Sequence, residues 1–178
     1  MDRVLDIRNV SVTYQNRDKS VYAVNNASLH LEKGDALGIV GESGSGKSTL
    51  AMAVLRLLPP RVAKVEGQVM LLGKDLFSAS VEEMNALRWK EMSVVFQKSM
   101  NSFSPVHRIG DQIEDIYRVH EPNATRKEIL DKTAELLYLV NLNERVYKLY
   151  PHELSGGMLQ RISIAVSLLH KPSLLILD

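Results

Sequence analysis

The nine residues from Gly41 to Thr49 constrain the fold of this chain more than any other segment. Their sequence, GESGSGKST, matches the spacing G-x-x-x-x-G-K-[ST], which binds phosphate when a strand precedes it and a helix follows it. The apolar run 36–40 predicts that strand, and residues 47–58 predict that helix. Glycines let backbone amides turn toward an anion, and the start of a helix adds the positive end of its dipole. We therefore predict a strand, a phosphate loop and a helix in this order.

The residue types within this phosphate loop (residues 41–49) assign the first roles. Lys47 is expected to reach the β- and γ-phosphates as a point charge, and Ser48 to ligate Mg²⁺ through its hydroxyl. Gly44 is an additional glycine that eases close approach of the backbone to phosphate. A flexible Gly/Ser linker is the alternative, and the flanking strand and helix argue against it. The other loop residues expected to contact the nucleotide are Gly41, Ser43, Ser45, Gly46 and Thr49.

Length and composition limit the class of protein. The 178 residues suffice for one domain, and 22 basic against 21 acidic residues give a net charge of about +1, which does not favour a surface that coats nucleic acid. The chain has no cysteine, so it carries no disulfide, thiolate nucleophile or thiolate metal site. The N-terminal stretch MDRVLDIRN lacks the apolar segment of a signal peptide, and no apolar run is long enough to span a membrane, so we expect neither feature.

The pattern of apolar residues, turns and capping motifs predicts strands first and helices later. Expected strands cover 4–14 with an irregularity near Asn9, 21–24, 27–31, 36–40, 67–72, 93–96 and 174–177. Expected helices cover 47–58, 80–90, 110–120, 125–140 and 157–170, and two begin with capping boxes, Ser80 with Glu83 and Thr125 with Glu128. This order predicts one α/β domain over 1–178. Its parts are a β region with the phosphate loop (about 1–98), a helical insert (about 99–155) and a final helix and strand (about 156–178).

Two further segments have weaker chemical signals of their own. The sequence LSGGM (154–158) places Ser155 as the N-cap of a helix, and Gly156 and Gly157 let the backbone approach a ligand. Taken alone, these residues favour an ordinary capped helix over an anion site. The strand 174–177 ends on Asp178, and in a P-loop protein an acid at this place commonly holds Mg²⁺.

Together these motifs resemble one family. GESGSGKST, VVFQ (94–97), LSGGMLQR (154–161) and LLILD (174–178), in this order and at these separations, resemble ABC-type ATPase subunits over nearly the whole chain. PHELSGGM (151–158), MNSFSPV (100–106) and IGDQI (109–113) resemble the oligopeptide and dipeptide importer branch, with nickel importers as close relatives. The resemblance implies a P-loop NTPase fold of ABC type. Such a fold has a mixed-sheet core, an N-terminal antiparallel β subdomain and a helical insert.

The resemblance also implies roles for individual residues. Tyr14 would stack on adenine, with Tyr22 as the weaker candidate. Gln97 would reach Mg²⁺ and the attacking water, and Asp178 would end the Walker B strand and hold Mg²⁺. The residues Ser155, Gly156 and Gly157 would contact the γ-phosphate of an ATP molecule held by the opposite subunit of a head-to-tail dimer. Met158 stands where the motif usually has Gln, as is common in the peptide-importer branch.

For the complete protein the resemblance implies ATP and Mg²⁺ as cofactors and a peripheral position at the cytoplasmic face of the cell membrane. Its implied partners are transmembrane permease subunits, a second ATP-binding subunit and, indirectly, a substrate-binding protein, without nucleic acid. The loop after Gln97 and the helical insert would pass motion to the permease. In the family, the catalytic glutamate, the switch histidine and further core strands follow the position of Asp178. We therefore expect this chain alone to bind ATP far better than it cleaves it. For the missing core strands we expect one of three outcomes: the chain is part of a longer protein, something else completes its sheet, or the fragment rearranges.

Other readings of the chain are a non-transport ABC ATPase that works on DNA or ribosomes, and a nucleotide-binding module without hydrolysis. A switch GTPase or a small kinase would share the phosphate loop but would leave LSGGM unexplained. Trp89 is expected to pack at a helix end. The five histidines show no metal-ligand spacing and are expected at surface or capping positions; they are His30, His107, His120, His152 and His170.

Overall fold

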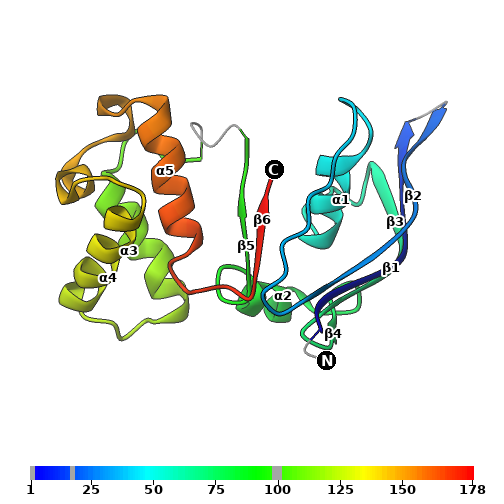
Figure 1. The fold of residues 1–178 in the computed structure, drawn as a ribbon, viewed down its shortest axis with the longest axis horizontal. Coiled ribbons are helices and arrows are strands. Elements are labelled where there is room, and N and C mark those ends of the chain that lie inside the picture. The colour runs from blue at the N-terminus through cyan, green and yellow to red at the C-terminus, as the bar shows by residue number, and fades with distance from the viewer. Residues whose placement is uncertain (1–2, 17–18, 98–101) are drawn as a thin grey trace. The chain divides into compact units, whose positions relative to one another are not determined.

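The computed structural model describes residues 3–16, 19–97 and 102–178 (Figure 1). They form two compact units, residues 1–85 and 86–178, and the boundary falls within one short helix. The mixture of strands and helices confirms the predicted α/β class. No helix of the described ranges is long and apolar enough to cross a membrane. Parts of the predicted turn 16–20 and of the segment 100–106 lie outside the described residues.

The first unit is built on an antiparallel sheet, as predicted. Its strands are β1 (Arg3–Asn16), β2 (Lys19–Glu32), β3 (Ala63–Leu71) and β4 (Lys74–Asp75), in the order β2-β1-β3-β4. Strand β1 lies between β2 and β3 and pairs with both along most of its length. The side chains of Val10, Val12 and Val69 are fully buried. The core of this unit therefore lies on the central strands of the sheet.

Two asparagines mark irregularities in the long β1–β2 ladder. The register shifts between Ile7 and Val10, where Asn9 has a φ of 50°, so the predicted irregularity near Asn9 is confirmed as a bulge. The register shifts again near Asn26, whose φ is 51°. This second bulge lets β2 continue as one strand. The prediction of two separate strands, 21–24 and 27–31, was therefore wrong.

The apolar run 36–40 does not form the predicted strand. The turn before it is present, because the Asp35 amide donates to the Glu32 carbonyl at 3.1 Å. Beyond the turn, Leu37 and Ile39 are about half exposed and Val40 is 96% exposed. A strand requires a neighbour that completes its ladder of hydrogen bonds, and no described strand pairs with this run. Composition alone could not supply that neighbour.

The helices of the first unit start where the sequence predicts but end earlier. Helix α1 covers Lys47–Val54 and stops before the expected Leu58, because Arg56 adopts a φ of 51° that does not continue a helix. The Arg56 guanidinium then donates to the carbonyls of Leu76 and Ala79.

The helix at the boundary, α2 (Val81–Leu87), begins with the predicted capping box. The Ser80 amide donates to the Glu83 carboxylate at 2.7 Å, and the Glu83 amide donates to the Ser80 hydroxyl at 3.1 Å. The helix ends at Leu87, before the expected Lys90, and Trp89 follows with a φ of 66°.

The second unit combines a parallel strand pair with a helical cluster. Strands β5 (Met92–Val95) and β6 (Leu174–Leu177) pair in parallel. The helices are α3 (Ile109–His120), α4 (Arg126–Leu139) and α5 (Gly156–Ser167), with 3₁₀ turns η2 (Glu144–Lys148) and η3 (Pro151–Glu153). Helix α5 starts one residue before and ends three residues before the predicted limits. The capping box of Thr125 and Glu128 at α4 is confirmed.

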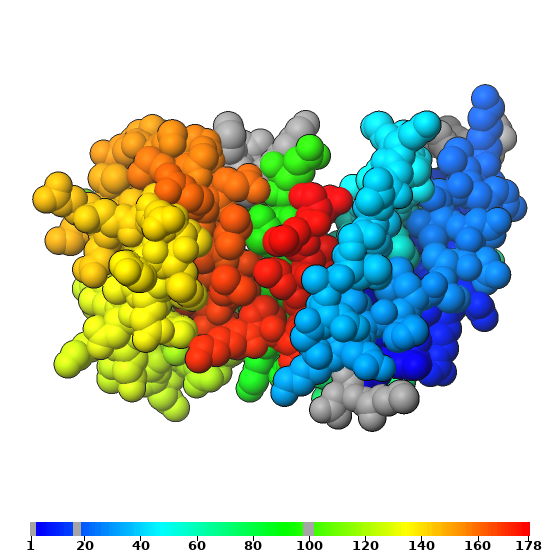
Figure 2. Space-filling model, in the orientation of Figure 1, coloured from blue at the N-terminus to red at the C-terminus, as the bar shows by residue number. Residues whose placement is uncertain are grey.

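The buried faces of α3, α4 and α5 form the core of this unit. Trp89 packs against that core, which confirms its predicted packing role. In the space-filling view, the side chains of α4 and of the residues that follow it lie packed together on the visible face (Figure 2). The buried apolar side chains include Phe103, Ile109, Ile113, Leu136, Leu137, Val146, Leu159, Ile162 and Val166.

A buried contact explains the glycine near the start of α3. A Cβ atom on Gly110 would lie 2.2 Å from the Tyr147 ring, so only glycine lets η2 pack against α3. The Tyr147 hydroxyl donates to the Glu114 carboxylate at 2.6 Å, and Arg126 from α4 also contacts that carboxylate at 3.1 Å. Burial and the neighbouring carboxylate raise the pKa of Tyr147, so the phenol remains a hydrogen-bond donor. This contact joins three elements of the helical cluster.

Candidate nucleotide-binding site

The phosphate loop packs its last glycine against a neighbouring strand. Gly46 is the N-cap of α1 and has a φ of 95°, in the left-handed region. A Cβ atom at this position would lie 2.1 Å from the carbonyl oxygen of Ala23 on β2. Gly44 also has a positive φ, of 83°, but a Cβ atom there would meet nothing within 4 Å. The loop therefore depends on glycine twice, and at Gly46 both conformation and space exclude any side chain.

The ammonium group of Lys47 lies against the phosphate loop itself. Its Nζ atom donates to the carbonyls of Gly41 and Glu42, both at 2.8 Å, and to the Ser45 hydroxyl at 3.3 Å. The Ser45 amide donates to the Glu42 carbonyl at 3.2 Å, which closes the turn. These contacts hold a positive charge beside the start of α1, where the sequence predicts the phosphate groups.

The start of α1 is arranged for an anion in a second way. Its N-cap makes no side-chain hydrogen bond, and its first turn contains no acidic residue. The first amides of a helix have no partner within the helix, and they carry the positive end of the dipole. Ser48 and Thr49 lie in this first turn, as the motif requires. The loop and the turn together offer backbone donors, a hydroxyl pair and one cation.

The predicted adenine-stacking residue lies in the same unit. Tyr14 is on β1, where it pairs with Val21 of β2 and Ala63 of β3, and its side chain is partly buried. The weaker candidate, Tyr22, lies on β2 and is 74% exposed. Both rings therefore have surface available for stacking, and the choice of Tyr14 stays a prediction.

In the second unit, Gln97 and Asp178 emerge at one edge of the strand pair. The ladder pairs Val95 of β5 with Leu177 of β6, and the Asp178 amide donates to the Val95 carbonyl at 3.0 Å. Gln97 follows β5 by two residues and is exposed. The carboxyl ends of parallel strands meet at the same edge of a sheet, so the amide and the carboxylate belong to the same rim of this unit.

The signature turn (residues 155–157) begins α5 as predicted. The Ser155 hydroxyl accepts a hydrogen bond from the Met158 amide at 3.3 Å, which makes Ser155 the N-cap. Only residues 168–173 connect α5 to β6, so the helix runs back along the strands. Its start faces the same end of the unit as the carboxyl ends of β5 and β6 (Figure 1). Helix α5 thus directs its positive dipole end toward the same end of the unit as Gln97 and Asp178.

The predicted site residues fall into two sets, one in each unit. The phosphate loop and Tyr14 belong to residues 1–85, and Gln97, the signature turn and Asp178 belong to residues 86–178. Arg161 is the last residue of the motif LSGGMLQR (154–161), but the sequence assigned it no role; its guanidinium donates to the carbonyl of Gly157 in the signature turn. The available signal was its spacing, because a residue four positions after Gly157 lies on the same face of the helix.

The residues present fit a nucleoside triphosphate with Mg²⁺. The glycine-lined loop, its helix start and Lys47 suit a chain of phosphate groups. Ser48 in the first unit and Asp178 in the second each carry a hard oxygen of the kind that Mg²⁺ prefers. The described residues contain no group of three or more acidic or histidine side chains that could hold a metal ion.

The fold and the phosphate loop define a P-loop nucleotide-binding protein. More narrowly, the chain belongs to the ABC transporter family, whose pattern matches residues 24–178. Solved structures of that family are similar to it in fold. An ATP-binding cassette solved as a dimer in a post-hydrolysis state with ADP and Pi matches 98% of this chain and 73% of its own, with a TM-score of 0.85 and 28% identity.

Peptide-transport proteins are similar to this chain along its whole length. The probable peptide ABC transporter ATP-binding protein y4tR of Sinorhizobium fredii is 41% identical over 99% of this chain. The oligopeptide transport ATP-binding protein OppD of Escherichia coli is 38% identical, also over 99% of this chain. The chain spans about half the length of these two relatives, 53% and 52% respectively.

Proposed function

We propose that this chain is the ATP-binding part of a subunit that powers an ABC importer of oligopeptides or dipeptides. The observation that carries the proposal is the phosphate loop, in which Gly46 packs without space for a side chain and Lys47 lies at the start of α1. Similarity to peptide-transport ATP-binding proteins over the whole chain supports the importer class.

Individual residues of this chain would have separate roles in binding and hydrolysing ATP. The amides of the phosphate loop and Lys47 would bind the phosphate groups, and Tyr14 would stack on adenine. Ser48 and Asp178 would hold Mg²⁺, which neutralises charge on the phosphates, and Gln97 would orient the attacking water. The shared rim of Gln97 and Asp178 supports these two roles.

The signature turn would act on the ATP of a second subunit. Its position at the start of α5, with a serine cap and a positive dipole end, suits the γ-phosphate. The solved relative with ADP and Pi is a dimer, which supports a paired arrangement for this chain. The second subunit is either another copy of this chain or a different ATP-binding subunit.

Transport would require further partners at the cytoplasmic face of the membrane. Transmembrane permease subunits would receive the motion of the ATP-driven dimer through the loop after Gln97 and the helical insert. A substrate-binding protein outside the membrane would deliver the peptide. A nickel importer subunit is the second candidate, since its sequence motifs are shared with the peptide branch.

The first experiment titrates Mg·ATP into the full-length protein and measures released phosphate in the same samples. Lys47→Ala should weaken ATP binding at least tenfold, about 1.4 kcal/mol, because it removes the one loop cation. Lys33→Ala, an exposed lysine of the same unit, is the matched control and should bind as the wild type does. Equal affinity of Lys47→Ala and the wild-type protein would refute the assigned site.

Substrate class is tested by reconstitution with the permease subunits in vesicles. Radiolabelled tripeptide should be taken up in an ATP-dependent manner, and Ni²⁺ should not. Uptake of Ni²⁺ alone would shift the proposal to the nickel branch while leaving the ATP site intact.

A further inference from the structure

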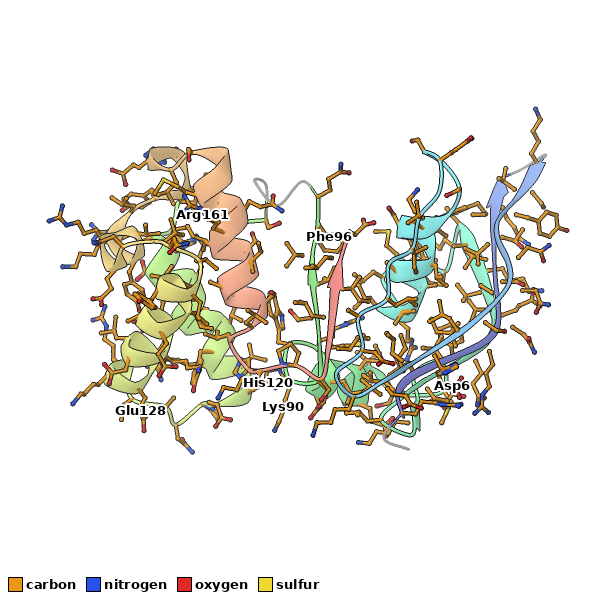
Figure 3. All side chains as sticks on the ribbon, viewed as in Figure 1. Asp6, Lys90, Phe96, His120, Glu128 and Arg161 are labelled. Carbon is orange, nitrogen blue, oxygen red and sulfur yellow. The ribbon has the colours of Figure 1, made fainter. Side chains whose placement is uncertain are left out.

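Arg161 links the start of α5 to the end of another helix. Its Nε atom donates to the carbonyl of Gly157 at 3.3 Å. One terminal nitrogen donates to the carbonyls of Val140 at 3.3 Å and Asn141 at 3.0 Å. Figure 3 shows Arg161 on α5 within the helical cluster. A single guanidinium therefore bridges the signature turn and the segment that ends α4.

The acceptors at the end of α4 are set by the backbone rather than by side chains. Asn141 has a φ of 53° and donates to the Tyr138 carbonyl, and Leu142 donates to the Leu137 carbonyl at 2.9 Å. This pattern closes the helix with a left-handed residue and points the next carbonyls outward. The carbonyls of Val140 and Asn141 also lie at the negative end of the α4 dipole, which favours a cation. The backbone conformation at the end of α4 therefore positions these two carbonyls independently of Arg161.

Arg161 contacts the signature turn, which is the part of α5 that the proposed function uses. Arg161 lies one turn after Gly157, and its guanidinium shares the Gly157 carbonyl with the helix. Leu159 and Ile162 are buried in the core of this unit and hold the inner face of α5. The first turn of α5 is held by its serine cap, by the Arg161 bridge and by the partly buried Leu154 and Met158, which pack against the same core. Arg161 links the Gly157 carbonyl to the end of α4, so we expect its removal to loosen the orientation of the signature turn while the buried contacts keep α5 in place.

We propose that Arg161 is a positioning residue for ATP hydrolysis. By bridging α4 and α5, it holds the amides of the signature turn in the direction of the γ-phosphate on the opposite subunit. This inference rests on the proposed function, because it takes the signature turn as the group that contacts that phosphate. Arg161 itself makes its hydrogen bonds inside its own unit and acts on the phosphate through the turn.

The test uses the full-length protein, with its partner subunits where hydrolysis requires them. Arg161→Ala removes the bridge, and Arg161→Lys keeps the charge but cannot reproduce a planar fork on three carbonyls. Tyr147→Phe is the matched control, because it removes one hydrogen bond of the same helical cluster without touching the α4–α5 link. Each variant is measured for ATP affinity in the absence of turnover, for kcat and KM of phosphate release, for ATP-driven dimer formation, and for its unfolding midpoint.

The expected result separates hydrolysis from nucleotide binding. Arg161→Ala should lower kcat on the order of 100-fold, as misplaced contacts do at active sites, while ATP affinity stays within about twofold. Arg161→Lys should recover only part of the loss. Tyr147→Phe should lower the unfolding midpoint and leave kcat within about twofold of wild type. Reduced ATP-driven dimer formation by Arg161→Ala alone would place the defect at the signature turn.

Two results would overturn the proposal. One is wild-type kcat and dimer formation in Arg161→Ala. The other is a loss of kcat in Tyr147→Phe that matches the loss in Arg161→Ala, since a general loss of stability would then explain both. If Arg161→Ala does not fold, the kcat and dimer formation of Arg161→Lys are compared with those of Tyr147→Phe and the wild type instead. A wild-type protein that binds no ATP and forms no ATP-driven dimer would instead refute the proposed function, and this inference with it.

Discussion

The chain contains two glycine-rich helix starts that are built in different ways. At the start of α1, Gly46 has a left-handed backbone and packs against the Ala23 carbonyl, and no side chain caps the helix. At the start of α5, Ser155 has an extended backbone and caps the helix through its hydroxyl. A Cβ atom on Gly157 would meet nothing within 4 Å. The first start is specified by conformation and space, the second by a cap and a side-chain bridge.

Glycine therefore has a different role at the start of α1 and at the start of α5. In the phosphate loop, conformation and packing both require glycine at Gly46, so a substitution there should affect folding and binding together. In the signature turn, a Cβ atom on Gly157 would meet nothing within 4 Å, so packing within this chain does not require glycine there. The comparison thus predicts that substitutions at the two helix starts differ in kind as well as in size.

The largest effect is expected for Gly46→Ala. The new Cβ atom would lie 2.1 Å from a backbone oxygen, and a left-handed alanine alone costs about 1–2 kcal/mol. We expect a loss of more than about 2 kcal/mol in the free energy of unfolding, and no measurable ATP binding. Urea unfolding and ATP titration of the full-length protein measure the two effects.

Gly44→Ala is the control for this prediction. It has a similar positive φ but open space around the Cβ position. Gly44→Ala should lower the free energy of unfolding by about 1 kcal/mol, the cost of a left-handed backbone at alanine alone. Equal losses for the two variants would show that packing against β2 does not specify the loop.

The loop was predictable from sequence because its requirements are local. Spacing alone identified the glycines, Lys47 and the helix start. The strand expected at 36–40 was wrong for the opposite reason, because a strand depends on a neighbour that composition does not reveal. In the same way, the early end of α1 follows from the left-handed Arg56, which no propensity for 47–58 indicates.

The next effect is expected for Ser155→Ala. The variant removes the hydroxyl that accepts from the Met158 amide, and loss of an N-cap costs about 1 kcal/mol. Phosphate release should fall together with stability, while ATP affinity of the phosphate loop stays unchanged. Ser155→Asn, which can also cap a helix, should restore stability. Stability restored without phosphate release would indicate that the hydroxyl also contacts the nucleotide.

Gly157→Ala should separate function from stability most clearly. Alanine favours a helix over glycine, and the Cβ position is open, so we expect a gain of about 0.5 kcal/mol in the free energy of unfolding. Phosphate release should nevertheless fall, because the added methyl group would lie where the proposed function places the phosphate. Denaturation and turnover assays on the same preparation measure both. Normal turnover in Gly157→Ala would contradict the proposal that a phosphate group approaches Gly157.

The candidate site of the second unit was less predictable than the phosphate loop. Ser155 as a cap and Asp178 at the end of a strand followed from the sequence, but Arg161 did not. Two of its acceptors are the backbone carbonyls of Val140 and Asn141, 21 and 20 residues away, at the end of α4 where Asn141 is left-handed. A lone arginine on a helix is most often a solvated charge. The packing of α4 beside α5 adds these two acceptors to the Gly157 carbonyl of its own helix.

The far end of α5 carries a histidine pair that the sequence assigned to surface or capping positions. His170 is only partly exposed, stacks on Tyr117 and meets the His120 ring edge-on, with ring centroids 5.1 Å apart in both contacts. Burial and the neighbouring His120 lower the pKa of His170, and Lys90 acts in the same direction. The Ile116 carbonyl and Glu121 oppose that shift. His120 and Lys90 both lie near this end of the cluster (Figure 3).

The smallest expected effect is a pH dependence of stability at this end of α5. The lowered pKa means that the folded state binds fewer protons than the unfolded state below about pH 6.5, so stability is full above that pH and is lost as pH falls. Because His170 remains partly exposed, the loss between pH 7 and pH 5.5 should stay below about 1 kcal/mol. His170→Phe keeps a ring on Tyr117 and should flatten the urea midpoint over this range. His30→Gln, an exposed histidine on β2, should leave the wild-type slope unchanged. The same slope in His170→Phe as in the wild type would assign the titration to another group.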